Sequence, residues 1–148
     1  MNNSSLFNER TFYDQFLFDL RNCNDEVIIE SPFITTSRIK SFFPIFEKLL
    51  SKGVKIYIVT RNPIEHESYA LKTQAEEVIC MFEEMGIQTL ICGGNHHRKL
   101  AILDRQILWE GSLNILSQNN SREIMRRIDD EALALQMFKF LKLGKEIE

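Results

Sequence analysis

One segment of the sequence carries four side chains that together could attack and hold a phosphodiester. His97 and Lys99 are two residues apart, so on an extended strand both side chains point to the same face. Ser112 and Asn114 repeat this spacing, and Gly111 before them allows close approach of the backbone. An imidazole can attack phosphorus or protonate a leaving oxygen near neutral pH, while cationic and amide donors stabilise charge on phosphate oxygens.

Two predicted strands would bring these groups together. Residues 98–103 and 106–110 are separated only by Asp104 and Arg105, a link short enough for a hairpin. Asp104 then marks the turn, and the second strand returns Asn114 to the side of His97 and Lys99. The candidate site is therefore expected at one end of this hairpin.

The rest of the chain alternates helix and strand signals. Apolar spacing and end signals predict helices over residues 8–21, with Asn8 as N-cap, and over 37–50, 71–85 and 131–143. Apolar runs predict further strands over residues 27–29, 54–60, 87–91 and 123–128. This alternation is typical of an α/β fold, and the later hairpin makes the sheet mixed. We predict a single domain over residues 1–148, with a mixed, mostly parallel sheet flanked by helices.

The complete pattern resembles the HKD signature of the phospholipase D superfamily. Six fixed letters stand at that family's spacing: His97-x-Lys99-x4-Asp104-x6-Gly111-Ser112-x-Asn114. The strand ending in residues 30–34 and the strand before Arg61 also fit, so the resemblance covers nearly the whole chain. With one motif in 148 residues, the chain is most similar to small single-motif bacterial HKD nucleases and their restriction-enzyme relatives.

The resemblance implies a phospholipase D-like fold and a role for each motif residue. His97 would form a covalent phosphohistidine, Lys99 and Asn114 would hold the phosphate oxygens, and Ser112 would assist at the same site. Asp104 and Gly111 would be structural. A downstream carboxylate usually orients the second ring nitrogen of the histidine, and Glu123 is the candidate in this sequence.

Such enzymes need two motifs for each site, because one histidine attacks while another protonates the leaving oxygen. This chain has one motif, so the resemblance implies a homodimer whose motifs meet across a two-fold axis. Each protomer would then contribute His97, Lys99 and Asn114.

Other polar residues have less specific interpretations. Arg61 could contact substrate from its strand end, or equally could cap or pair with a carboxylate, and Arg98 is a second candidate for the substrate rim. We expect His96 to be a loop residue pointing away from His97, and His66 to be a solvated loop residue. Cys92 with the two neighbouring histidines lacks the spacing and the fourth ligand of a zinc site, so we expect no metal and no cofactor.

Composition narrows the class of protein. The net charge is −3, so binding to nucleic acid requires a local basic patch. The N-terminus lacks a secretory signal, and no run approaches the ~20 apolar residues of a membrane span. We therefore expect a cytoplasmic, metal-independent phosphodiesterase that acts as a nuclease on DNA or RNA. The alternatives are a non-catalytic nucleic-acid-binding module or subunit of a helicase or restriction assembly, and a phospholipid phosphodiesterase.

Overall fold

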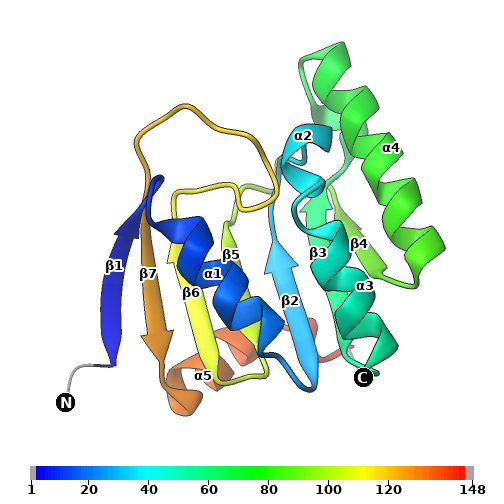
Figure 1. Ribbon diagram of the computed structural model, residues 1–148. Coiled ribbons are helices and arrows are strands. Elements are labelled where there is room, and N and C mark those ends of the chain that lie inside the picture. Colours follow the sequence, from blue (N-terminus) through cyan, green and yellow to red (C-terminus); the bar gives the residue numbers. More distant parts are fainter. Residues whose placement is uncertain (1–2, 146–148) are drawn as a thin grey trace.

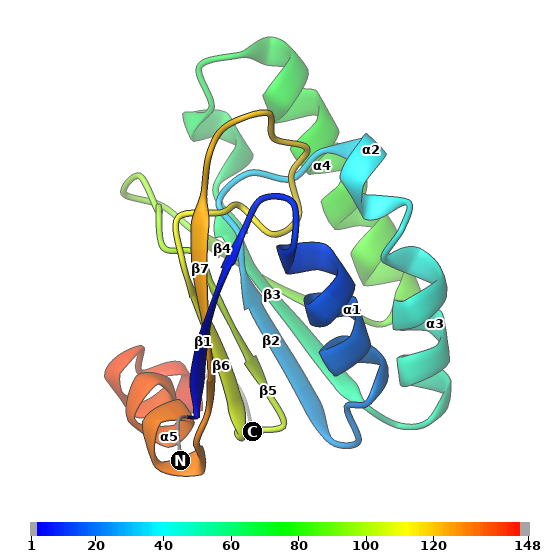
Figure 2. The ribbon, with the colours of Figure 1, turned by 60° about the vertical axis from the view of Figure 1, so that its left-hand side comes forward.

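The computed structural model describes residues 3–145 as one seven-stranded mixed sheet with helices on both faces. The strands are β1 (Ser4–Asn8), β2 (Glu26–Glu30), β3 (Lys55–Arg61), β4 (Gln88–Cys92), β5 (Leu100–Leu103), β6 (Ile107–Gly111) and β7 (Ile124–Asp129). The helices are α1 (Phe12–Arg21), α2 (Thr36–Ile39), α3 (Phe43–Ser51), α4 (Tyr69–Met85) and α5 (Glu131–Phe140), with 3₁₀ turns η1 (Pro63–Glu65) and η2 (Leu143–Lys145). Helices α1 to α4 cover one face and α5 covers part of the other (Figures 1 and 2).

The sheet order is β1-β7-β6-β5-β2-β3-β4. The predicted mixed α/β sheet is confirmed, but the expectation that it is mostly parallel is wrong. Only β2–β3 and β3–β4 pair in parallel, whereas β1–β7, β7–β6, β6–β5 and β5–β2 are antiparallel. Parallel pairing needs a helical crossover, and α2 to α4 supply crossovers only between β2, β3 and β4.

The first element also differs from expectation. Residues 4–8 form the edge strand β1, paired with β7, and the predicted helix over 8–21 begins only at Phe12. Asn8 is not the N-cap, because its side-chain Oδ1 accepts the backbone N–H groups of Arg10 and Thr11 in a turn before the helix. A partner strand more than a hundred residues away decides this segment, and local periodicity carries no signal of it.

Two apolar layers fix which way the strand residues face. Ala101 and Leu103 of β5 pack in the layer under α1, α3 and α4, together with Phe12 and Trp109. The alternate residues Leu100 and Ile102 pack in the layer under α5. Because neighbouring strand residues point to opposite faces, β5 sets the direction of the side chains just before it in the sequence.

Candidate active site

The predicted site residues come from three segments that meet at one end of the sheet. His97 and Lys99 lie in the extended segment between β4 and β5, Ser112 and Asn114 follow β6, and Glu123 precedes β7. These connections lie together at the end of the sheet where β2 and β3 terminate (Figure 1). The hairpin of β5 and β6 is antiparallel, as predicted, and pairs Leu100 with Glu110 at this end.

His97 and Lys99 contact each other directly. Lys99 Nζ lies 2.8 Å from His97 Nδ1 and donates a hydrogen bond of 2.8 Å to the carbonyl oxygen of His97. The nearby Lys99 cation, followed by burial and the Arg61 cation, lowers the pKa of His97 below the usual histidine value. A lowered pKa keeps an imidazole neutral to more acidic pH, and only the neutral ring has a nitrogen lone pair that can attack phosphorus.

The charge of Lys99 is affected by burial and by the Glu123 carboxylate. Its pKa is lowered by partial burial, whereas the charge of Glu123 opposes that shift. Among residues 3–145 the Glu123 side chain accepts a hydrogen bond from the Ser121 hydroxyl and not from His97. The orienting contact implied for Glu123 is not formed in the structure, in which His97 Nδ1 faces Lys99 instead.

Ser112 and Asn114 anchor the loop that follows β6. The N–H of Ser112 donates to the carbonyl of Ile124, and its Oγ accepts the N–H of Ile124 at 3.0 Å. Ser112 therefore joins the two ends of the loop that connects β6 and β7. Asn114 has a buried Oδ1 without a hydrogen-bond partner in the described part of the chain. Buried amide oxygens are normally satisfied, so this one is an exception, and only the Nδ2 group of Asn114 can donate to a phosphate oxygen.

Gly111 is required by the close approach of β7. A Cβ atom built on Gly111 would lie 2.1 Å from the carbonyl oxygen of Ile124 and 2.9 Å from Met125 Cα. These are backbone atoms in the strand that Ser112 also binds, so they cannot move without disturbing the ladder.

We expect Gly111→Ala to lower the free energy of unfolding by about 1–3 kcal/mol, the usual cost of overpacking. Urea denaturation followed by circular dichroism measures this change. Gly144→Ala is the matched control, because its added Cβ meets only Phe138 Cε2 at 3.8 Å. Equal stability of both variants and the wild type would contradict the steric role of Gly111.

Asp104 lies at the opposite end of the hairpin from the other motif residues. Its carboxylate accepts the backbone N–H groups of Asn24, Asp25 and Glu26, with distances of 2.8–3.0 Å. Asp104 and Arg105 have φ of 55° and 52°, the left-handed conformations that a tight hairpin turn requires. Asp104 thus connects the hairpin turn to the start of β2, which supports the structural role implied for it.

The two candidate substrate arginines lie in different surroundings. Arg61 Nε donates to the carbonyl of His96 at 3.2 Å, and its guanidinium lies over the Phe33 ring at 4.9 Å. Its charge lowers the pKa values of both His97 and Lys99, so it belongs to the same cluster. Arg98 instead donates from Nε to Glu30 Oε1 at 3.1 Å, on the other face of the segment. The structure therefore brings Arg61 to the site, whereas Arg98 is held behind it.

The sequence analysis did not identify the two carboxylates, Glu30 and Glu65, that contact the segment just before His97. His96 is buried, with Nε2 3.1 Å from Oε1 of the fully buried Glu30. Glu65 accepts the N–H groups of Gly94 at 2.9 Å and Asn95 at 3.2 Å. The one available signal was a carboxylate at the end of the apolar run Val27–Ile29, where burial demands a partner.

The expectation for His66 is wrong. The residue is 8% exposed, its ring stacks against Phe33 at 5.1 Å, and neither ring nitrogen has a hydrogen-bond partner among the described residues. Burial lowers its pKa below the usual value. The Phe33 ring, which comes from the segment after β2, covers a position that looks polar and solvated in the sequence.

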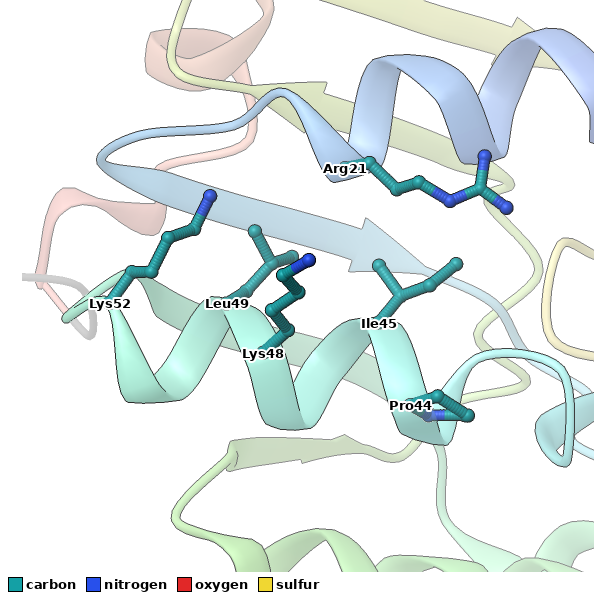
Figure 3. A pocket seen from close by; sticks show the side chains of 6 residues that line it. All are labelled: Arg21, Pro44, Ile45, Lys48, Leu49 and Lys52. Atoms are coloured by element: carbon teal, nitrogen blue, oxygen red, sulfur yellow. The ribbon is translucent and has the colours of Figure 1, made fainter.

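A separate hollow of about 270 Å³ lies between α1 and α3. Figure 3 shows its lining: Arg21 comes from α1, and the α3 side supplies Pro44, Ile45, Lys48, Leu49 and Lys52. The hollow runs along α3 and faces the C-terminal end of α1, and none of its lining residues belongs to the candidate site. Within residues 3–145, no three His, Cys, Asp or Glu side chains converge as metal ligands would, and no helix is long and apolar enough to cross a membrane.

A family model for the cardiolipin synthase, PLD-like domain matches residues 17–142 of the chain. The chain belongs to the phospholipase D superfamily. Curated protein sequences provide no match.

Solved structures of this superfamily share the fold. NucT from Helicobacter pylori has a TM-score of 0.73 and 20% identity, over 97% of this chain and 95% of NucT. Nuc from Salmonella typhimurium, a phospholipase D family member, has a TM-score of 0.72 and 15% identity, over 94% of this chain and 91% of Nuc. A phosphatidylserine synthase from Haemophilus influenzae has a TM-score of 0.61 and 12% identity, over 90% of this chain but only 37% of that protein.

Proposed function

We propose that this phospholipase D-like protein is a nuclease that hydrolyses phosphodiester bonds of DNA or RNA through a phosphohistidine at His97, without a metal cofactor. The observation that carries the proposal is the His97–Lys99 pair. An exposed imidazole with a lowered pKa lies 2.8 Å from a cation, and Arg61 binds the carbonyl of the adjacent His96. This arrangement supplies a nucleophile and donors for a phosphate group within one cluster.

Mutual overlap with the small structures NucT and Nuc supports nucleic acid over phospholipid as the substrate. The chain spans nearly the full length of NucT and Nuc, and it spans 37% of the phosphatidylserine synthase. One compact domain with one motif fits the small HKD nucleases that the motif resembles. The candidate site is also an open polar surface, since His97 and Ser112 are exposed.

The proposed reaction has two steps. The nitrogen lone pair of His97 attacks phosphorus, the bond from phosphorus to the leaving oxygen breaks, and a protonated histidine gives its proton to that oxygen. Water then attacks the phosphohistidine, loses a proton to the second histidine, and breaks the N–P bond. Lys99, Asn114 and Arg61 stabilise the charge on the phosphate oxygens in both steps.

We infer that the second histidine comes from another copy of the chain. Within the described residues His96 faces the opposite way toward Glu30, and His66 is buried under Phe33. Neither can protonate a leaving oxygen next to His97. We therefore propose a homodimer in which the partner's His97 is the general acid and the two-fold axis passes through the site.

Cleavage of single- and double-stranded DNA and RNA in EDTA tests the proposal. We expect cleavage that resists EDTA and depends on the concentration of dimer. Hydrolysis of phosphatidylglycerol in vesicles, without cleavage of nucleic acid, would show that the protein is a phospholipid phosphodiesterase instead. Salt-dependent nucleic-acid binding with no cleavage by the wild type would indicate a binding module instead.

A further inference from the structure

Glu30 is a fully buried carboxylate directly behind the proposed nucleophile. It is the last residue of β2 and has no solvent-exposed surface. Its Oε1 lies 3.1 Å from His96 Nε2 and accepts a hydrogen bond of 3.1 Å from Arg98 Nε. These two partners are the immediate neighbours of His97 in the sequence, one on each side.

The contacts of Glu30 orient its neighbours more than they stabilise the fold. Burying a carboxylate costs several kcal/mol, which is recovered only when its partners are well placed. Glu30 Oε2 has no hydrogen-bond partner among the described residues, and the contact of His96 Nε2 with Oε1 is close but lacks hydrogen-bond geometry. By contrast, Glu26 at the other end of β2 uses both oxygens, which accept Arg105 Nε at 3.0 Å and Nη2 at 3.1 Å. The Glu30 contacts are therefore less complete although its burial is greater.

Side chains of the extended segment 96–99 alternate between the two faces of the sheet, and this alternation connects Glu30 to the site. Glu30 holds residues 96 and 98 on the α5 side of the sheet, so residues 97 and 99 are directed to the opposite side, where His97 meets Lys99. Register adds to this constraint, because Glu30 pairs with Leu100 in β5. Arg61 and Glu65 bind the backbone of the same segment through residues 94–96.

We propose that Glu30 is a positioning residue that, through His96 and Arg98, fixes the directions of His97 and Lys99 at the phosphate. This proposal rests on the proposed nuclease function for its kinetic consequence and on the geometry alone for its structural one. A displacement of about 1 Å in a reacting group can cost about 10²-fold in rate. Loss of the Glu30 charge should therefore reduce turnover without removing any group that touches substrate.

Two isosteric variants on the same strand test the proposal. Glu30→Gln is expected to lower kcat by about 10- to 100-fold, with a smaller change in KM. Glu26→Gln is the matched control, because it removes the charge of a carboxylate that also pairs with an arginine, at the opposite end of β2. Glu26→Gln is expected to leave kcat within about twofold of the wild-type value, because distant sites that share no partners rarely affect each other. Equal kcat values for both variants would overturn the proposal.

A titration of His97 supplies a readout that general destabilisation does not move. The chain has three histidines, so their imidazole NMR signals are readily assigned by substitution. In the wild type and in Glu26→Gln, the His97 signal should titrate below the usual value, because Lys99 lies next to it. In Glu30→Gln the pKa of His97 should rise toward about 6.5 as the pair separates. An unchanged pKa in Glu30→Gln would overturn the proposal even if kcat falls.

Arg98→Leu approaches the cluster from its half-exposed side and serves if Glu30→Gln does not fold. A positioning role predicts a lower kcat and a raised pKa of His97, whereas direct substrate binding predicts a higher KM with kcat unchanged. The latter result would overturn the proposal. If the wild type cleaves no nucleic acid, the proposed function fails, but the His97 titration still decides whether Glu30 positions the segment.

Discussion

His97→Ala is expected to reduce nucleic-acid cleavage in EDTA by about 10⁴-fold or more, the scale seen when a nucleophile is removed from an enzyme. The variant should fold normally, because His97 is exposed and its side chain contacts only Lys99 among the described residues. Matched thermal melts and cleavage rates on labelled oligonucleotides measure both statements. If His97→Ala cleaves nucleic acid at the wild-type rate, a phosphohistidine at His97 is excluded, and the activity belongs to another group or to a contaminant.

Mixed dimers extend this prediction to the second histidine. When equal amounts of wild-type and His97→Ala chains are co-refolded, about one quarter of the dimers carry two functional histidines, assuming random pairing. We expect cleavage to fall to about one quarter of that of an all-wild-type sample at the same total concentration. A value of about one half would mean that each protomer acts independently, which would contradict the composite site.

Asp19→Ala is expected to lower the free energy of unfolding by about 3–5 kcal/mol, because it leaves a half-buried guanidinium without its partner. Asp19 Oδ2 accepts Arg127 Nε at 2.7 Å and Trp109 Nε1 at 3.0 Å, while Oδ1 accepts Arg127 Nη2 at 3.1 Å. The contact with Asp19 also raises the pKa of Arg127. This residue therefore joins α1 to β6 and β7 through hydrogen bonds that no neighbour replaces.

Chemical denaturation at neutral pH measures this loss. Asp14→Ala is the control on the same helix, since Asp14 is exposed in the first turn and should cost at most about 1 kcal/mol through the helix dipole. Similar losses for Asp14→Ala and Asp19→Ala would show that the buried network contributes little. Arg127 pairs with Asp19, which is 108 residues away in the sequence.

The sequence by itself determined the elements whose signals are local. Apolar spacing predicted α4, Gly86 marked its end, and the short link at Asp104 predicted the β5–β6 hairpin. The two-residue spacing of His97 and Lys99 also predicted that their side chains share a face, and in the structure Lys99 Nζ lies 2.8 Å from His97 Nδ1. In each of these cases neighbouring residues alone decide the conformation, because backbone geometry repeats over a few positions.

Only the tertiary structure decided the features that depend on distant segments. Pairing with β7 made residues 4–8 a strand, and the Phe33 ring buried His66. Ser121 binds the Glu123 carboxylate that was expected at His97, and β2 buries Glu30 against His96 and Arg98. Burial and ion pairing are determined by which segments meet in space. A carboxylate has the same appearance in the sequence whether the folded protein exposes it to solvent or buries it.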